Sequence, residues 1–145
     1  MTRKWVVDAS VAAKWLVPEA DSAVAVSVLD DQLLAPELLC AELANLLWKK
    51  QARSEMDAVT AGLAYRSLSY APLTLYACSE LAQDALQCAI ELRHPAYDCF
   101  YLALSARENC TVLTADRRFA ELVERAPALR GRILLLSDLN AAARK

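Results

Sequence analysis

Four carboxylates of the 145-residue chain, Asp8, Glu42, Asp98 and Asp116, are the side chains best placed to share one chemical site. Asp8 ends a short β-type run, and Asp116 follows another. Open parallel sheets bind ligands at the carboxyl ends of their strands, near the point where strand order reverses. Each acid also has a simpler interpretation. Asp8 could be a loop acid near a helix start, and Asp116 could simply cap the helix that begins at Arg117.

Glu42 and Asp98 fall on helical patterns. Leu38, Glu42 and Leu46 share one helix face at i, i+4 spacing, so this carboxylate lies beside apolar residues. Burying an unpaired charge costs roughly several kcal/mol, so Glu42 must reach the edge of the core or find a partner such as a salt bridge. Asp98 lies in the first turn of a very apolar helix. There it either complements the helix dipole or is directed at the same rim as Asp8.

Arg117 and Arg118 occupy the first turn after Asp116, where cations oppose the helix dipole. Contacts with phosphate, or with nearby carboxylates, would explain this placement; two solvated arginines are the alternative. If the four acids converge, they raise one another's pKa and destabilise the fold unless a cation neutralises them. Ligands that are all oxygen suit Mg²⁺ or Mn²⁺. We therefore expect the four acids to hold such an ion for attack of water on a phosphoryl centre.

Short β-type runs alternate with longer helical patterns, which predicts βαβ units and a parallel sheet. The predicted strands are Lys4–Val7, Gln32–Ala35, Leu73–Tyr76, Thr111–Thr114 and Ile133–Leu136. The predicted helices are Val11–Leu16 after a Ser10 cap, Ser22–Leu29, Glu37–Lys50, Ser54–Leu68, a Ser79-capped helix to Leu92, Ala96–Glu108, Arg117–Glu124 and one begun by Ser137. We expect a three-layer α/β/α sandwich with a five-stranded, mainly parallel sheet, as one domain over residues 1–145.

Composition restricts the possible functions. With only two glycines, the chain lacks the Gly-rich loops of phosphate cradles and dinucleotide sites. The net charge of −2 argues against a sequence-independent nucleic-acid binder, but not against an enzyme that holds RNA locally. The five cysteines are scattered without a CxxC pair, as in reduced cytosolic proteins. No apolar run approaches the roughly 18 residues of a membrane span, and the N-terminus reaches an acid too soon for a secretion signal. We expect a cytoplasmic protein with no membrane partner.

The chain resembles PIN-domain ribonucleases, specifically the VapC-type toxins of bacterial toxin–antitoxin systems. The segments that carry the resemblance are Val6–Val11 with the following Lys14–Leu16 and Pro18–Glu19, Pro36–Leu47, Ala96–Leu104 and Leu113–Phe119. The resemblance implies an α/β/α PIN fold, endoribonuclease activity that depends on Mg²⁺ or Mn²⁺, and an RNA substrate. It also implies inhibition by a VapB-like antitoxin and a homodimer.

Carried over residue by residue, the resemblance implies that Asp8 and Asp98 are the principal metal ligands. Glu42 and Asp116 would complete the acidic cluster, binding the metal directly or through water. Thr114 would orient Asp116 or a metal-bound water, and Ser10 would hydrogen-bond within the site. The chain departs from the family at Cys99 and Phe100, where small residues are common; this departure affects packing behind the site but leaves the acids intact.

Two other classes compete with this interpretation. A receiver-like phosphotransfer domain shares the predicted fold, but it needs an acidic pair near the first strand and a lysine after the last, and Ile133–Asp138 contains no lysine. A non-catalytic α/β interaction module would bind a partner helix through the apolar side chains of Trp15, Leu16, Trp48 and Tyr65. Ordinary core packing is the simpler explanation of these four residues.

Overall fold

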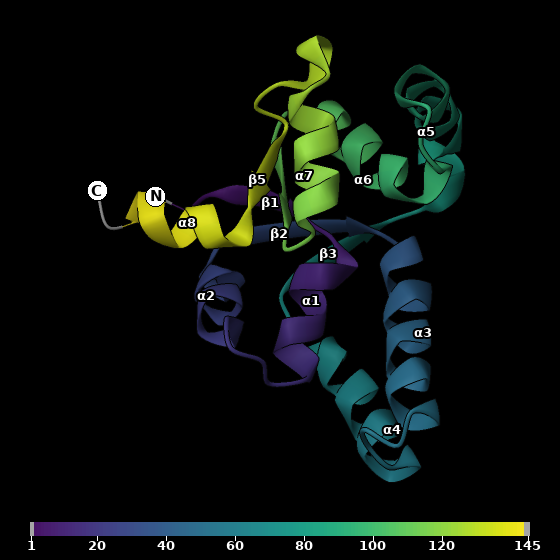
Figure 1. Ribbon diagram of the computed structural model, residues 1–145, viewed down its shortest axis with the longest axis vertical. Coiled ribbons are helices and arrows are strands. Elements are labelled where there is room, and N and C mark those ends of the chain that lie inside the picture. Colours follow the sequence, from purple (N-terminus) through teal and green to yellow (C-terminus); the bar gives the residue numbers. More distant parts are fainter. Residues whose placement is uncertain (1, 144–145) are drawn as a thin grey trace.

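The computed structural model describes residues 2–143 and contains a five-stranded sheet with helices on both faces (Figure 1). Its strands are β1 (Lys4–Val7), β2 (Gln32–Pro36), β3 (Leu73–Tyr76), β4 (Thr111–Thr114) and β5 (Ile133–Leu135). They lie in the order β3-β2-β1-β4-β5, and every neighbouring pair is parallel. The chain moves outward from β1 to β3 and then returns to β4, so the strand order reverses between β1 and β4. Ligands of parallel sheets bind at such a point.

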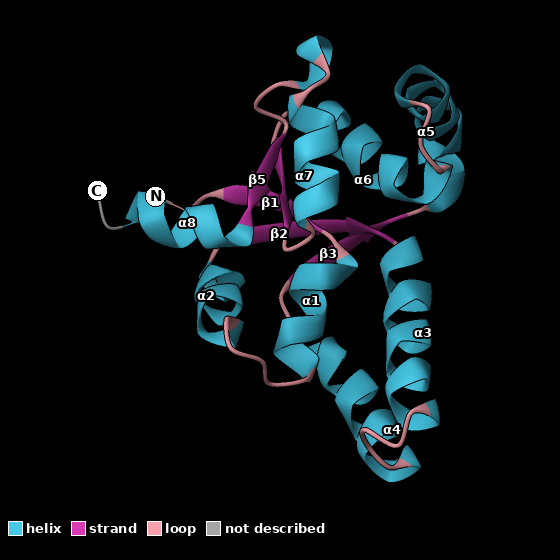
Figure 2. Ribbon diagram, in the orientation of Figure 1, coloured by secondary structure: helices cyan, strands magenta, loops and turns pink. Residues whose placement is uncertain are grey.

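The helices complete the predicted three-layer sandwich (Figure 2). They are α1 (Ala9–Leu16), α2 (Ser22–Ser27), α3 (Leu38–Ala52), α4 (Ala58–Ser67), α5 (Cys78–Leu92), α6 (Ala96–Arg107), α7 (Arg117–Glu124) and α8 (Leu136–Ala143). In Figure 2, α5, α6 and α7 lie on one side of the sheet, and α1, α2 and α4 lie on the other. Helices α3 and α4 extend together away from the sheet. Short 3₁₀ turns occur at Val28–Asp30, Leu68–Tyr70 and Pro127–Leu129.

The central strand β1 is buried on both faces. Val6 and Val7 are both fully buried, and because successive side chains of a strand point to opposite faces, they belong to different parts of the core. Val6 joins a cluster with residues of α5, α6 and α7, whereas Val7 packs with Val11, Ala25 and Leu139. Burial on both faces explains why β1 is apolar from Trp5 to Val7, and why Asp8, directly after β1, stands out from its surroundings.

The structure corrects where several helices begin. Ser10 does not cap the first helix: Asp8 is the N-cap, and its side chain accepts a hydrogen bond from the amide of Val11. Ser79 does not cap α5, which begins at Cys78 after Ala77. The predicted helix from Ser54 is also wrong at its start, because α4 begins only at Ala58. The predicted last strand is one residue too long, since Leu136 already begins α8 rather than Ser137.

The late start of α4 has a clear physical cause. Ser54 has a φ of 59°, in the left-handed region, so it cannot continue a right-handed helix and instead forms the turn after α3. Asp57 then caps α4 by accepting a hydrogen bond from the amide of Thr60 at 2.7 Å. The polar residues between the two helices therefore form a connection and not a helical turn.

Two further observations concern the sequence-based expectations. All five cysteines are free in the structure. Among residues 2–143, none of the helices has both the length and the apolar character needed to span a membrane.

Candidate active site

Asp8 lies at the carboxyl end of β1, beside the point where strand order reverses, and only 8% of its surface is exposed. Its carboxylate accepts hydrogen bonds from the hydroxyls of Ser10 and Thr114 and from the amide of Val11. Burial raises the pKa of Asp8 from 3.8 to about 6; the three hydrogen bonds oppose the rise, and the charge of Asp98 adds to it. The protein thus holds this carboxylate firmly but leaves its negative charge poorly compensated.

Ser10 and Thr114 connect the start of α1 to the end of β4. Thr114 is fully buried, and its hydroxyl, besides donating to Asp8, accepts a hydrogen bond from the amide of Asp116 at 3.0 Å. The Ser10 hydroxyl accepts one from the amide of Ala115 at 2.8 Å. Residues more than a hundred positions apart in the chain are therefore joined through two hydroxyl groups around the Asp8 carboxylate.

Replacing Thr114 by valine is expected to lower the stability of the protein. The substitution keeps the shape of the side chain but leaves an oxygen of Asp8 and the amide of Asp116 without their partner, at a cost of about 1–3 kcal/mol in the free energy of unfolding. Urea denaturation measures this loss. Thr114→Ser keeps the hydroxyl and is the matched control. Equal stability of the valine and serine variants would show that the hydroxyl has no such role.

Glu42 lies on α3 and is half-buried, as its apolar helix face predicted. Its partner is not a cation: the Tyr101 hydroxyl donates a hydrogen bond to Glu42 Oε1 at 2.6 Å. Burial raises the pKa of Glu42, the Tyr101 hydrogen bond lowers it, and the charge of Asp98 raises it further. Tyr101 is itself buried, and burial followed by the charge of Glu42 raises its pKa. The neutral hydroxyl of Tyr101 therefore positions the Glu42 carboxylate without neutralising its charge.

Asp98 lies in the first turn of α6 and has a partner that the sequence analysis missed. His94 Nε2 donates a hydrogen bond to Asp98 Oδ2 at 2.7 Å when the carboxylate is ionised. The His94 ring is parallel to that of Phe119 on α7, with centroids 6.1 Å apart and an interplanar angle of 7°. The backbone of Phe119 in turn donates to Asp116 Oδ1 at 3.2 Å. His94 and Phe119 thus connect Asp98 to Asp116.

Replacing His94 by alanine is expected to weaken divalent-cation binding about tenfold, because partners that orient a ligating carboxylate typically affect metal affinity by ten- to a hundredfold. His94→Gln places an amide nitrogen near the same position and should restore part of the affinity. Titration of the protein with Mn²⁺, followed by electron paramagnetic resonance, measures the effect. If alanine and glutamine variants both bind Mn²⁺ like the wild type, His94 does not orient Asp98.

Asp98 is close enough to two of the other acids to influence them. Its charge adds to the effect of burial and raises the pKa of Asp8 and of Glu42. Asp116 is attached through its backbone to Thr114, while its side chain caps α7, which agrees with its simpler interpretation. Within residues 2–143, no three His, Cys, Asp or Glu side chains are already arranged to hold a metal ion. The donor chemistry nevertheless fits a hard divalent cation, because it is oxygen alone and carries uncompensated negative charge.

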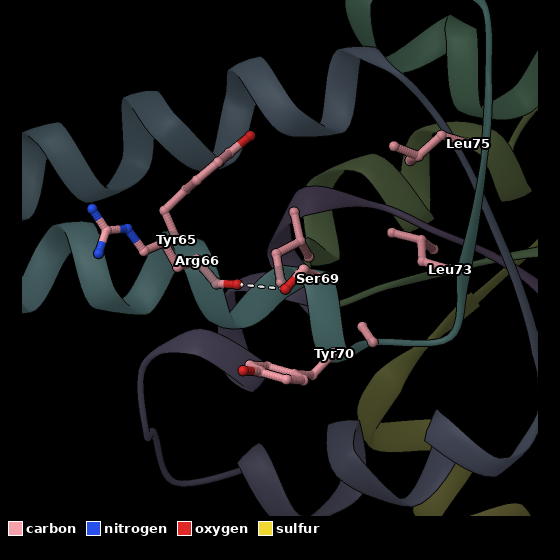
Figure 3. A pocket seen from close by; sticks show the side chains of 8 residues that line it. Tyr65, Arg66, Ser69, Tyr70, Leu73 and Leu75 are labelled. Carbon is pink, nitrogen blue, oxygen red and sulfur yellow. Dashed lines mark hydrogen bonds between the residues drawn. The ribbon is translucent and has the colours of Figure 1, made fainter.

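The acidic residues do not line the cavity at the sheet edge, which has a volume of about 630 Å³ (Figure 3). That cavity lies beside β3, and its lining is mostly apolar, including Tyr65, Leu68, Tyr70, Leu73 and Leu75. Ser69 closes part of its wall by donating a hydrogen bond to the carbonyl of Arg66 at 2.9 Å. With no titratable acid in its lining, this cavity lacks the groups needed for the chemistry predicted at Asp8.

The chain is similar to known proteins in both sequence and fold. The family model of the PIN domain matches residues 5–124. Ribonuclease VapC3 of Pyrobaculum aerophilum is 32% identical over 130 residues, which cover 87% of this chain and 97% of that protein.

Solved structures show the same fold. PAE2754 from Pyrobaculum aerophilum superposes with a TM-score of 0.72 at 20% identity and covers 100% of this chain and 98% of its own. A toxin–antitoxin complex from Klebsiella pneumoniae gives a TM-score of 0.64 at 12% identity, over 91% and 97% of the two chains. VapBC2 from Rickettsia felis, bound to a DNA fragment from its promoter, gives a TM-score of 0.60 at 11% identity. The match covers 91% of this chain and 98% of that chain.

Proposed function

Because the chain belongs to the PIN-domain family, we propose that it is a VapC-type endoribonuclease that cleaves RNA with the help of a divalent cation. The observation that carries the proposal is the buried Asp8 carboxylate, which lies where the strand order reverses and is repelled by Asp98. The PIN family model also argues against the receiver-like alternative, since it matches most of the chain. We propose a single nuclease domain over residues 1–145.

The acids would hold Mg²⁺ or Mn²⁺, with Asp8 and Asp98 as direct ligands and Glu42 and Asp116 as direct or water-mediated ones. When bound, such an ion neutralises negative charge on the scissile phosphate and activates the attacking water. Ser10 and Thr114 fix the orientation of Asp8. His94 engages one oxygen of Asp98, and Tyr101 one oxygen of Glu42, so each carboxylate keeps a second oxygen for a cation.

The remaining parts of the proposal concern substrate and products. Arg117 and Arg118 are exposed at the start of α7, next to Asp116, and would contact phosphates of the RNA. Attack of water on the phosphoryl centre would leave 5′-phosphate and 3′-hydroxyl ends, as the family resemblance implies. We also propose a cytoplasmic location, which agrees with the free state of all five cysteines.

A VapB-like antitoxin is the proposed inhibitor, and a homodimer the proposed assembly. Two proteins of the same fold are described as toxin–antitoxin or VapBC complexes. Of the four residues predicted to form a partner surface, Trp48 is 60% exposed, whereas Trp15, Leu16 and Tyr65 are half-buried against the core. An exposed tryptophan on α3 is a suitable anchor for a partner segment. The apolar partner surface of the interaction-module alternative is therefore proposed as the place where the antitoxin binds the nuclease.

Incubation of the purified protein with cellular RNA tests the proposal. Mg²⁺ or Mn²⁺ should produce defined fragments, and mapping of their ends should show 5′-phosphates. A chelator should prevent the reaction. Absence of divalent-dependent cleavage across transfer, ribosomal and messenger RNA would overturn the proposed function.

A further inference from the structure

Two cavities lie near Asp8, one along α3 and one at the ends of β4 and β5. The α3 cavity has a volume of about 300 Å³ and is lined by Ala9, Glu42, Asn45, Leu46 and Lys49. The β5 cavity has a volume of about 200 Å³ and is lined by Asp21, Ala115, Arg117, Leu135, Leu136 and Ser137. Helix α3 follows β2, and the β5 cavity adjoins the ends of β4 and β5. Because β2 and β4 flank β1 on opposite sides, the cavities flank Asp8 on opposite sides as well.

Both cavities are continuous with the acidic residues. The α3 cavity contains Glu42 itself and Ala9, the residue after Asp8. The β5 cavity contains Ala115, whose amide donates to the Ser10 hydroxyl that in turn contacts Asp8. A small substrate would need only one such cavity. A polymer cut at Asp8 must continue in both directions, and paired cavities suit it.

Each cavity offers one cation that forms no ion pair within the described residues 2–143. These cations are Lys49 in the α3 cavity and Arg117 in the β5 cavity. By contrast, the neighbouring Lys50 pairs with Glu55 at 3.6 Å. Since the chain carries a net charge of −2, local cations of this kind are what would hold an anionic polymer beside the acids.

The acids near Arg117 do not cancel its effect. Asp21 in the β5 cavity pairs with Lys14 at 2.7 Å, and this partner lowers the pKa of Asp21, so its charge is already balanced. On its other side, Arg117 borders a surface with Glu121, Glu124 and Asp138. Those carboxylates would repel a phosphate there, which favours the β5 cavity as the position of an anion next to Arg117.

We propose that the two cavities are subsites for the nucleotides on either side of the scissile phosphate, an inference that rests on the ribonuclease function proposed above. Lys49 and Arg117 contact the flanking phosphates of single-stranded RNA. Asn45, whose amide both donates and accepts hydrogen bonds, contacts a base edge in the α3 cavity. The acidic cluster between the two cations receives the phosphate that is cut.

Binding of a short fluorescein-labelled single-stranded RNA to the Asp8→Asn protein in Mg²⁺, measured by anisotropy at several salt concentrations, tests this assignment. Adding Lys49→Ala or Arg117→Ala should weaken binding about five- to tenfold, and lower the salt slope by about 0.7 for each lost phosphate contact. The matched controls are Lys50→Ala, one residue along α3, and Arg125→Ala, at the opposite end of α7. Both controls should bind like the parent protein.

The outcomes separate this inference from the proposed function. If the wild-type protein cleaves RNA but Lys49→Ala and Arg117→Ala bind like their controls, the subsites are wrong and the nuclease remains. If the wild type neither binds nor cleaves RNA, both proposals fail. Asn45→Ala provides a second test, in which binding is compared for RNAs that differ at one flanking base. The variant should bind these RNAs with more similar affinities than the wild type does. Unchanged relative affinities would show that Asn45 does not contact the flanking base.

Discussion

Replacing Asp8 by asparagine is expected to reduce RNA cleavage about a thousandfold or more, while stabilising the metal-free protein. Cleavage falls because an amide is a poor ligand for a hard cation compared with a carboxylate. Stability rises because the folded protein raises the pKa of Asp8 from 3.8 to about 6, which at neutral pH corresponds to about 3 kcal/mol of destabilisation. Asparagine removes this charge and still serves as an N-cap for α1.

Two measurements check this result together, namely an RNA cleavage assay and urea denaturation without divalent ions. Asp84→Asn, the same substitution at an exposed position on α5, is the matched control and should change neither quantity. Full cleavage by a folded Asp8→Asn protein would contradict the proposed mechanism. A loss of stability in this variant would contradict the charge effect instead, and would indicate that the hydrogen bonds from Ser10 and Thr114 need a carboxylate.

Divalent cations are expected to abolish most of the pH dependence of stability around neutrality. Without metal, ionised Asp8 destabilises the folded state above pH 6, and this effect disappears as the pH falls toward 3.8. The raised pKa of Glu42 acts in the same direction. The metal-free protein should therefore become more stable between pH 7.5 and pH 5. Saturating Mn²⁺ should raise the melting temperature at pH 7.5 by about 5–10 °C, and by less at pH 5, where protons compete for the site.

Thermal denaturation with Mn²⁺, Mg²⁺ or a chelator, at the two pH values, measures these effects. The Asp8→Asn protein supplies the comparison, since it lacks the main titrating group and should show a much smaller Mn²⁺ shift. An equal shift in wild type and Asp8→Asn would place the cation elsewhere. Cleavage that persists in a chelator would rule out metal-assisted hydrolysis.

The strands were largely predictable because they depend on short-range patterns. Lys4–Val7, Leu73–Tyr76 and Thr111–Thr114 have the predicted bounds: Asp8 follows the first, Pro72 precedes the second and Asp116 comes shortly after the third. An acid directly after a buried strand of a parallel sheet can only emerge at the carboxyl edge. This explains the position of Asp8 after β1, whereas Asp98 lies in the first turn of α6 and follows no strand; the convergence of the four acids on one cation stays a prediction.

The partners of the acids were not predictable to the same degree. Glu42 required some partner, but nothing in the sequence selects the hydroxyl of Tyr101, which lies 59 positions away. His94 and Asp98 are four residues apart, yet Pro95 separates His94 from α6, so the helical spacing rule does not apply directly. The sequence predicts Ser10 as the cap of α1 instead of Asp8, because both residue types are good N-caps and the choice depends on which side chain reaches the amide of Val11 in the folded protein.

The position of β1 at the middle of the sheet affects when a growing chain acquires this site. Thr114, which holds Asp8 in place, is made by the ribosome 106 positions after it. Pairing of β1 with β4 must therefore wait until β4 has emerged from the ribosome. An unfinished chain consequently carries the acids without their assembled surroundings. The surroundings of Asp8 are therefore complete only once β4 has been made and has paired with β1.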